Sequence, residues 1–205
     1  MLVLIDHPLV IEKLTRLRDK RTNCLEFRRL LGEISLLMAY EIARDFKTIP
    51  VKVETPLGVS AGVRMEREVV LVPILRAGLG MLESILKIMP EARIGFLGLR
   101  RDEETLQPHH YYSNIPSDLS QAEVILIDPM LATGGSVDSA MGMLSANKAA
   151  NVRLLSLVAA PEGIRLVTER YPELPIYTAA VDERLNEKGY ILPGLGDAGD
   201  RLFGV

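Results

Sequence analysis

From residue 69 onward, short apolar segments alternate with longer segments in which apolar residues recur at helical spacing. Apolar runs occupy residues 69–75, 94–99, 124–127, 152–160 and 176–181, and helix-like segments lie near 80–88, 137–148 and 161–171. Near-continuous apolar strands separated by helices are typical of a parallel sheet that is covered on both faces. We therefore predict an α/β fold with a mostly parallel sheet flanked by helices.

The N-terminal part of the chain has a different pattern, which predicts two helices over about residues 8–46. Pro8 suits the start of the first helix, and Asn23 with Glu26 resembles a capping box at the start of the second. Apolar residues at helical spacing in the second helix predict one buried stripe, made of Phe27, Leu30, Leu31, Ile34, Leu37 and Met38. Two alternating segments then flank Pro-Leu-Gly at residues 56–58, which predicts a hairpin within residues 51–63.

Two segments do not fit the alternation of strands and helices. Residues 102–118 are polar and aromatic and contain two prolines, so we expect an exposed arm or a long functional loop there. The glycine-rich C-terminal segment, about residues 189–205, keeps many apolar side chains, and we expect it to pack over the rest of the protein as a hood. Because no repeat or low-complexity linker interrupts the chain, we expect a single domain over residues 1–205.

Composition and charge narrow the class of protein. The 205 residues carry a net charge of −3, which provides no basic field for holding nucleic acid. The single cysteine, Cys24, cannot form an internal disulfide, and the N-terminus lacks the pattern of a secretion signal. No uninterrupted apolar run is long enough to span a membrane. We expect a cytoplasmic protein with neither a membrane nor a nucleic acid as its partner.

The strongest chemical signal is the sequence VILIDPMLATGGS at residues 124–136. An apolar strand ends at Asp128, a loop follows, and Thr133, Gly134, Gly135 and Ser136 lead into a helix. Glycines let backbone N–H groups approach a phosphate, and the helix N-terminus adds positive partial charge. We therefore interpret residues 133–136 as a phosphate cradle, with Asp128 placed to accept hydrogen bonds from sugar hydroxyls. The alternative is that the two glycines only form a tight turn.

Several familiar motifs are absent or incomplete. The sequence contains no G-x-x-x-x-G-K-[ST], which argues against hydrolysis of a nucleoside triphosphate. Residues 194–199 satisfy G-x-G-x-x-G, but only six residues follow, so the dinucleotide-binding interpretation fails. The three histidines show neither triad nor zinc spacing. We therefore expect catalysis by positioning and charge stabilisation, without a covalent nucleophile and without a metal held directly by the protein.

The segment at residues 128–136 resembles the signature of the phosphoribosyltransferases, and in the form D-P-M-L-A-T-G-G-S it resembles the uracil phosphoribosyltransferase family. VPILRAGLGM at 72–81, GLRRDEETLQP at 98–108 and GYILPGLGDAGDR at 189–201 are similar to the same family. The resemblance implies transfer of the phosphoribosyl group of 5-phospho-α-D-ribose 1-diphosphate to uracil, giving UMP and diphosphate in pyrimidine salvage. It also implies a homodimer or homotetramer, Mg²⁺ bound mainly through the substrate diphosphate, and GTP as a candidate activator.

Site residues follow from the same resemblance, position by position. Arg76 and Arg101 would bind the diphosphate, and with Asp197 they form the expected catalytic set. Asp197 would lie between the two substrates and act on the base. Uracil would contact Ile191, Gly196, Asp197 and Ala198, largely through backbone groups. The expected phosphoribosyl diphosphate site consists of Arg76, Arg101, Asp128, Pro129, Met130, Leu131, Ala132, Thr133, Gly134, Gly135, Ser136 and Asp197.

Two rival interpretations stay open at this point. A purine or orotate phosphoribosyltransferase would keep the fold and change the base, although the segment YILPGLGDAGD at residues 190–200 argues against it. A regulator that binds uridine nucleotides and controls RNA would need a basic surface, which the acidic balance of the chain does not favour.

Overall fold

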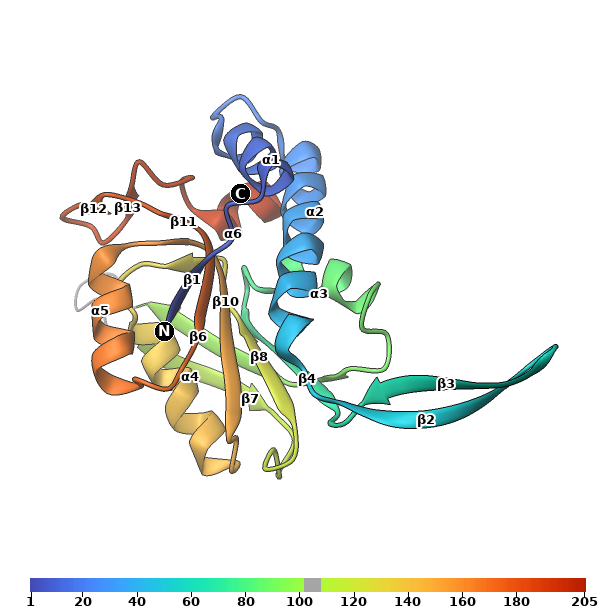
Figure 1. The fold of residues 1–205 in the computed structure, drawn as a ribbon. Coiled ribbons are helices and arrows are strands. Elements are labelled where there is room, and N and C mark those ends of the chain that lie inside the picture. The colour runs from blue at the N-terminus through green and yellow to red at the C-terminus, as the bar shows by residue number, and fades with distance from the viewer. Residues whose placement is uncertain (102–107) are drawn as a thin grey trace.

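The computed structural model describes residues 1–101 and 108–205, and a central, mostly parallel sheet forms its core (Figure 1). Its strands are β1 (Leu2–Leu4), β4 (Val69–Leu75), β5 (Arg93–Ile94), β6 (Phe96–Arg101), β7 (Pro108–Asn114), β8 (Glu123–Ile127), β9 (Met130–Leu131), β10 (Asn151–Ala159) and β11 (Ile176–Val181). The order across the sheet is β1, β11, β10, β8, β4, β6, β7, with β5 beside β4 and β9 beside β10. Every neighbouring pair on this path is parallel except β6 and β7. The predicted α/β fold is confirmed.

Helices cover both faces of the sheet. Successive side chains of a strand point to opposite faces, and the apolar strands therefore have two apolar faces to bury. One face packs against α1 (Pro8–Arg18), α2 (Cys24–Ile42), α3 (Leu79–Leu86) and α6 (Ala198–Phe203), and the other against α4 (Gly135–Ala146) and α5 (Pro161–Arg170). In β4, for example, Leu71 faces the first group of helices while Val70 and Val72 face the second. Strands buried on both sides explain the continuous apolar runs in the sequence.

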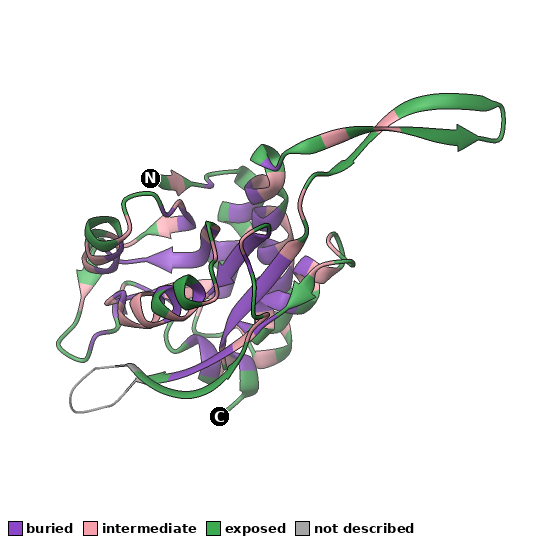
Figure 2. Cartoon of the chain, turned by 90° about the horizontal axis from the view of Figure 1, so that it is seen from below, coloured by how far each residue is buried: buried purple, intermediate pink, exposed green. Residues whose placement is uncertain are grey.

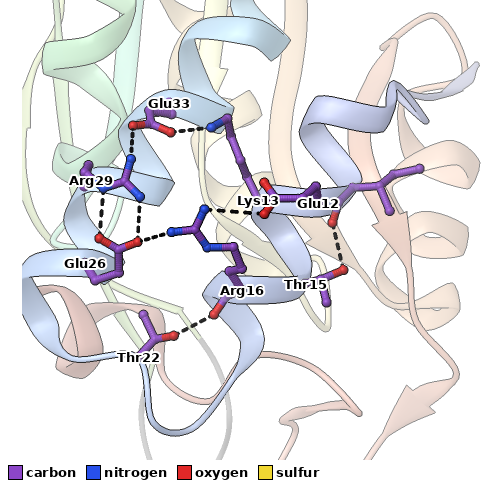
Figure 3. Close-up of polar contacts among 9 residues, drawn as sticks. Glu12, Lys13, Thr15, Arg16, Thr22, Glu26, Arg29 and Glu33 are labelled. Carbon is purple, nitrogen blue, oxygen red and sulfur yellow. Dashed lines mark hydrogen bonds and ion pairs between the residues drawn. The ribbon is translucent and has the colours of Figure 1, made fainter.

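The two N-terminal helices form one unit. The Asn23 side chain accepts a hydrogen bond from the Glu26 N–H at 3.0 Å, which confirms the predicted cap of α2. The predicted stripe is buried, with Leu37 partly exposed at its margin. Across the two helices, Arg16 pairs with Glu26 and Lys13 pairs with Glu33, each at 2.6 Å, while Arg29 binds both glutamates (Figure 3). A 3₁₀ turn, η1 (Ala43–Asp45), follows α2.

A long hairpin projects from the body of the protein (Figure 1). It consists of β2 (Thr48–Thr55) and β3 (Gly58–Met65), paired antiparallel, which confirms the predicted hairpin and extends it in both directions. Figure 2 shows that the hairpin is exposed along most of its length. Its exposed side chains include several apolar ones: Val53, Leu57, Val59, Val63 and Met65.

The prediction of an arm or loop over residues 102–118 needs correction. Within this range, the structure describes residues 108–118, and residues 108–114 form β7, an edge strand paired antiparallel with β6. Residues 109–114 are all exposed, Tyr111 and Tyr112 included, which accounts for the polar and aromatic side chains of this strand. Residues 102–107 lie outside the described residues. The segment that projects as an arm is therefore the β2–β3 hairpin.

The C-terminal hood, residues 189–205, is packed as predicted. Ile191, Leu195 and Leu202 are each 3% exposed and belong to the core. The hood's strand β13 (Ile191–Leu192) pairs antiparallel with β12 (Arg184–Leu185), which precedes the hood, and α6 lies near its end. The sequence pattern did not predict these short elements or β1. None of the helices formed by the described residues is long and apolar enough to cross a membrane.

Candidate active site

The predicted site residues follow strands that end at the same edge of the sheet. Pro73 of β4 lies opposite Ile127 of β8, and Leu75 lies opposite Gly98 of β6. The chain runs from β4 to β6 on one side of β4 and then to β8 on its other side. Open α/β sheets bind ligands at such a switch point, beyond the carboxyl ends of the strands. This edge is therefore the candidate active site.

Arg76 follows β4 directly, and its loop packs closely against the end of β8. A Cβ atom added to Gly78 would stand 2.8 Å from the Ile127 carbonyl oxygen, so only glycine allows this approach. The peptide bond between Leu75 and Arg76 is cis. The Arg76 side chain is 62% exposed, and its Nη2 lies 3.8 Å from an Asp200 carboxylate oxygen. The structure thus brings Arg76 together with the C-terminal hood.

Residues 128–132, which precede the predicted phosphate cradle, are bonded to β10 and to the residue after it. The N–H groups of Leu157 and Val158 donate to the Pro129 carbonyl at 3.0 and 3.1 Å, and the Ala160 N–H donates to the Leu131 carbonyl at 2.8 Å. Met130 and Leu131 form β9 and pair with β10. The carbonyl groups of Pro129 and Leu131 thus fix this stretch to the neighbouring strand and the residue after it. Asp128, at the start of this stretch, is partly buried, and one of its carboxylate oxygens accepts a 3.4 Å hydrogen bond from the Met130 N–H.

The phosphate cradle itself, residues 133–136, forms the start of α4. Gly134 has a φ of +87° and precedes the first helical residue, Gly135. The N–H groups of a first helical turn have no partners within their own helix, and the helix dipole makes this end positive. Asp138 is also in this turn, but its carboxylate is paired with Arg170 and accepts from the Tyr171 hydroxyl at 2.9 Å. The Gly135 N–H donates to the Thr133 hydroxyl at 3.4 Å, and the binding of a phosphate at residues 133–136 stays a prediction.

The hood presents its predicted uracil-binding residues in two ways. The side chains of Ile191 and Ala198 are buried in the core, at 3% and 4% exposure, which leaves only their backbone for a ligand. Gly196, with a φ of +80°, and Asp197 are exposed. One Asp197 carboxylate oxygen accepts from the Asp200 N–H at 2.9 Å, so this side chain also caps α6.

Two further points concern the predicted set. Arg101 is the last residue of β6, paired in register with Pro108, and its side chain lies outside the described part of the structure.

Among the residues that the structure describes, no cluster of three or more His, Cys, Asp and Glu side chains is arranged to hold a metal ion. The loop after β8 offers a single carboxylate, Asp128, because Pro129 follows it.

Sequence reasoning missed three charged residues that hold the hood: Arg18, Asp182 and Arg201. Arg18 and Asp182 form an ion pair that binds the Gly194 backbone, and Arg201 donates to the Leu195 carbonyl. Arg18 and Asp182 are 164 residues apart, so no local motif could have joined them.

Comparison with solved structures defines the class of this fold. A hypoxanthine-guanine phosphoribosyltransferase from Bacillus anthracis covers 75% of this chain and 78% of its own, with a TM-score of 0.51 and 15% identity. A purine phosphoribosyltransferase from Pyrococcus horikoshii covers 75% and 84%, with a TM-score of 0.52 and 13% identity. The chain has a phosphoribosyltransferase-type fold.

Closer relatives identify the branch. The family model described as uracil phosphoribosyltransferase matches residues 3–205. Proteins named uracil phosphoribosyltransferase from Dictyoglomus turgidum and Halalkalibacterium halodurans are 52% and 54% identical, over 100% and 98% of this chain and 100% and 96% of theirs. The AQ2163 protein of Aquifex aeolicus has a TM-score of 0.95 at 42% identity, covering 100% of this chain and 99% of its own. The chain belongs to the uracil phosphoribosyltransferase family.

Proposed function

We propose that this chain transfers the phosphoribosyl group of 5-phospho-α-D-ribose 1-diphosphate to uracil, at the edge of the sheet where β4, β6 and β8 end. Family membership over residues 3–205 supports the reaction and the base. The observation that carries the assignment of the site is the approach of the hood to Arg76: the Arg76 guanidinium lies 5.7 Å from the Phe203 ring, and its Nη2 lies 3.8 Å from an Asp200 oxygen. This approach supports the proposal that the groups for both substrates lie at one place.

In the proposed mechanism, a ring nitrogen of uracil displaces diphosphate at the anomeric carbon, through a transition state with oxocarbenium character. Arg76 and Arg101 hold the departing diphosphate, and their positive charge stabilises the negative charge that develops on it. The phosphate cradle, residues 133–136, holds the 5′-phosphate, supported by residues 129–132, and Asp128 orients the ribose. With both substrates fixed, the reacting atoms need no covalent nucleophile.

Uracil presents two carbonyl acceptors and a ring N–H, which backbone groups of the hood can match. In the proposal these groups belong to Ile191, Gly196 and Ala198, which agrees with the burial of the first and last side chains. Asp197 polarises or deprotonates the base. Cytosine would leave polar groups unpaired at a cost of about 1–3 kcal/mol each, so the site discriminates against it.

Mg²⁺ fits this site as an ion carried by the substrate. Phosphoribosyltransferases generally use Mg²⁺ together with the diphosphate of the substrate. The loop after β8 supplies one carboxylate, Asp128, whereas Mg²⁺ prefers six oxygen ligands and keeps much of its water. Diphosphate oxygens and water would supply most of the other oxygen ligands. The ion would add positive charge beside the leaving group.

Assembly and regulation are part of the proposal. The exposed apolar side chains of the β2–β3 hairpin, with Leu57 at 99% exposure, favour burial against a second copy in a homodimer or homotetramer. GTP is the proposed activator, and the proposed location is the cytoplasm. Sedimentation velocity with and without GTP measures the assembly, and a monomer under both conditions contradicts it. Diphosphate release at fixed substrate concentrations, with and without GTP, measures the activation.

The decisive experiment is a diphosphate-release assay with Mg²⁺ and phosphoribosyl diphosphate, offering uracil, cytosine, hypoxanthine and orotate separately. We expect release with uracil alone. Release with another base would keep the phosphate cradle and overturn the assignment of the hood to uracil. Absence of release with all four bases, with and without GTP, would overturn the proposed function.

A further inference from the structure

The glycine-rich turn of the hood is bonded to an ion pair from distant parts of the chain. Arg18, the last residue of α1, donates to the two carboxylate oxygens of Asp182 at 2.8 and 2.7 Å. The same Arg18 Nη1 donates to the Gly194 carbonyl at 2.8 Å, and the Gly194 N–H donates to Asp182 at 2.9 Å. Both backbone polar groups of Gly194 are therefore bonded to one ion pair.

This ion pair is partly enclosed and fixed to the sheet. The Asp182 side chain is 6% exposed and that of Arg18 is 21% exposed. Asp182 follows β11 directly, and its N–H donates at 2.8 Å to the carbonyl of Ala159, the last residue of β10. A two-pronged contact between a guanidinium and a carboxylate fixes direction as well as distance. The ion pair thereby fixes the turn at Gly194 relative to the carboxyl ends of β10 and β11.

A second arginine holds the next residue of the turn. Arg201 Nη1 donates to the Leu195 carbonyl at 2.8 Å, and its Nη2 donates to the Asp19 carbonyl at 2.8 Å. Its guanidinium lies 4.5 Å from the centre of the Phe27 ring. The carbonyls of Gly194 and Leu195 are thus both bonded to guanidinium groups inside the protein. Gly196 comes next and is exposed.

Packing of a side chain cannot hold residue 194 itself. Gly194 has a φ of +62°, and a Cβ atom there would stand 2.2 Å from the Ile191 carbonyl oxygen. Glycine is therefore required, and it has many accessible backbone conformations to lose on ordering. Hydrogen bonds to its backbone remain as the means of fixing it, and Arg18 with Asp182 provides them.

We propose that Arg18 and Asp182 are positioning residues for the base: they set the Gly194 backbone, and through it the exposed backbone of Gly196 that contacts uracil. This inference rests on the proposed function. It predicts that disturbing the pair weakens the use of uracil selectively. Within the described part of the chain, the side-chain hydrogen bonds of Arg18 and Asp182 go to each other and to Gly194, and none goes to the β4 or β8 loop that holds the phosphoribosyl diphosphate in the proposal.

The test is Arg18→Ala, with the KM for uracil and the KM for phosphoribosyl diphosphate measured separately at a saturating concentration of the other substrate. Losing charge-assisted hydrogen bonds should raise the KM for uracil about 10- to 100-fold and leave the other KM within about twofold. Equal changes in both constants, or an unchanged KM for uracil, would overturn the inference.

Arg153→Ala is a matched control. Arg153 pairs with Glu123, with side chains 16% and 9% exposed, so this pair is enclosed to a similar degree. Both residues lie near the amino-terminal ends of β10 and β8, at the opposite edge of the sheet from the candidate active site. We expect a loss of thermal stability similar to that of Arg18→Ala, with both KM values unchanged. A rise in the KM for uracil in this control would assign the Arg18 effect to general loosening and overturn the inference.

Two conservative variants keep the test decisive if Arg18→Ala does not fold. Asp182→Asn keeps the shape of the side chain but loses its charge, and its NH₂ group faces N–H donors of Arg18 or Gly194. Arg18→Lys keeps the positive charge but loses the two-pronged geometry of the guanidinium. Both should raise the KM for uracil selectively, Arg18→Lys less than Arg18→Ala where the latter folds. Wild-type kinetics in both would overturn the inference while leaving the proposed function intact, whereas an inactive wild-type protein would defeat the proposed function itself.

Discussion

Gly163 links helix α5 to the support of the phosphate cradle, and its replacement should disturb the binding of phosphoribosyl diphosphate. A Cβ atom at this position would stand 2.4 Å from the Ala132 carbonyl oxygen and 3.0 Å from that of Leu131. Approaches below 3.0 Å are essentially never found for Cβ atoms. Gly163→Ala must therefore move the helix or the loop by more than about half an ångström. Close-packed interiors transmit such a displacement to their neighbours.

The size of the effect follows from where that displacement goes. The Leu131 carbonyl is already bonded to the Ala160 N–H, so movement of residues 131–132 shifts the phosphate cradle that follows them. A misplacement of about 1 Å can cost about 100-fold in rate, so about half of it should cost roughly tenfold. Overpacking costs about 1–3 kcal/mol, and alanine recovers up to about 1 kcal/mol of helix propensity. We expect a net loss of stability of about 0–3 kcal/mol, which lowers Tm by less than about 12 °C.

The assay is the initial rate of diphosphate release as phosphoribosyl diphosphate is varied at saturating uracil. Gly142→Ala is the matched control: this glycine lies on the exposed side of α4, and a Cβ atom there would meet nothing within 4 Å. The control should gain up to about 1 kcal/mol of stability and keep its activity. A folded Gly163→Ala protein with wild-type kcat/KM, or an equal loss in Gly142→Ala, would refute the reasoning.

Three further predictions concern charged residues. Arg76→Ala should lower kcat/KM about 10- to 100-fold, because a charge-assisted contact worth about 1.5–3 kcal/mol is lost, and unchanged efficiency in the folded variant would remove Arg76 from the site. Asp197→Asn should depress kcat without unfolding, since asparagine caps a helix as well as aspartate does; normal turnover with an unaltered circular dichroism spectrum would end its proposed role. The hydrogen bond from Arg29 lowers the pKa of Glu26 from 4.5 to about 2. Its contribution to stability is therefore present above pH 4.5 and is lost as the pH falls from there to about 2. Tm measured against pH should fall less steeply over that range in Glu26→Gln, and parallel curves would contradict this account.

Strands and long helices could be predicted from the sequence because their patterns are local. The apolar run at residues 69–75 became β4 with the same bounds, and Asn23 caps α2 as expected. By contrast, β1 is three residues long and exists through its pairing with β11, more than 170 residues away, so no local pattern marks it. The polar segment at 108–114 was misinterpreted for a related reason: an edge strand carries the composition of a loop unless its partner is known.

The candidate site also has one part that a local sequence pattern reveals and one part that depends on distant residues. The phosphate cradle is built from consecutive residues between a strand and a helix, so its glycines and its helix start appear together in the sequence. The turn at Gly194 also appears as a glycine motif, but what fixes it does not: Arg18 is 176 residues away from it. A substitution at Arg18 or Asp182 would leave every recognisable motif intact and still move the groups that contact the base. In the proposal, the binding of uracil therefore depends on residues outside the motif that identifies it, and the uracil KM of Arg18→Ala measures that dependence directly.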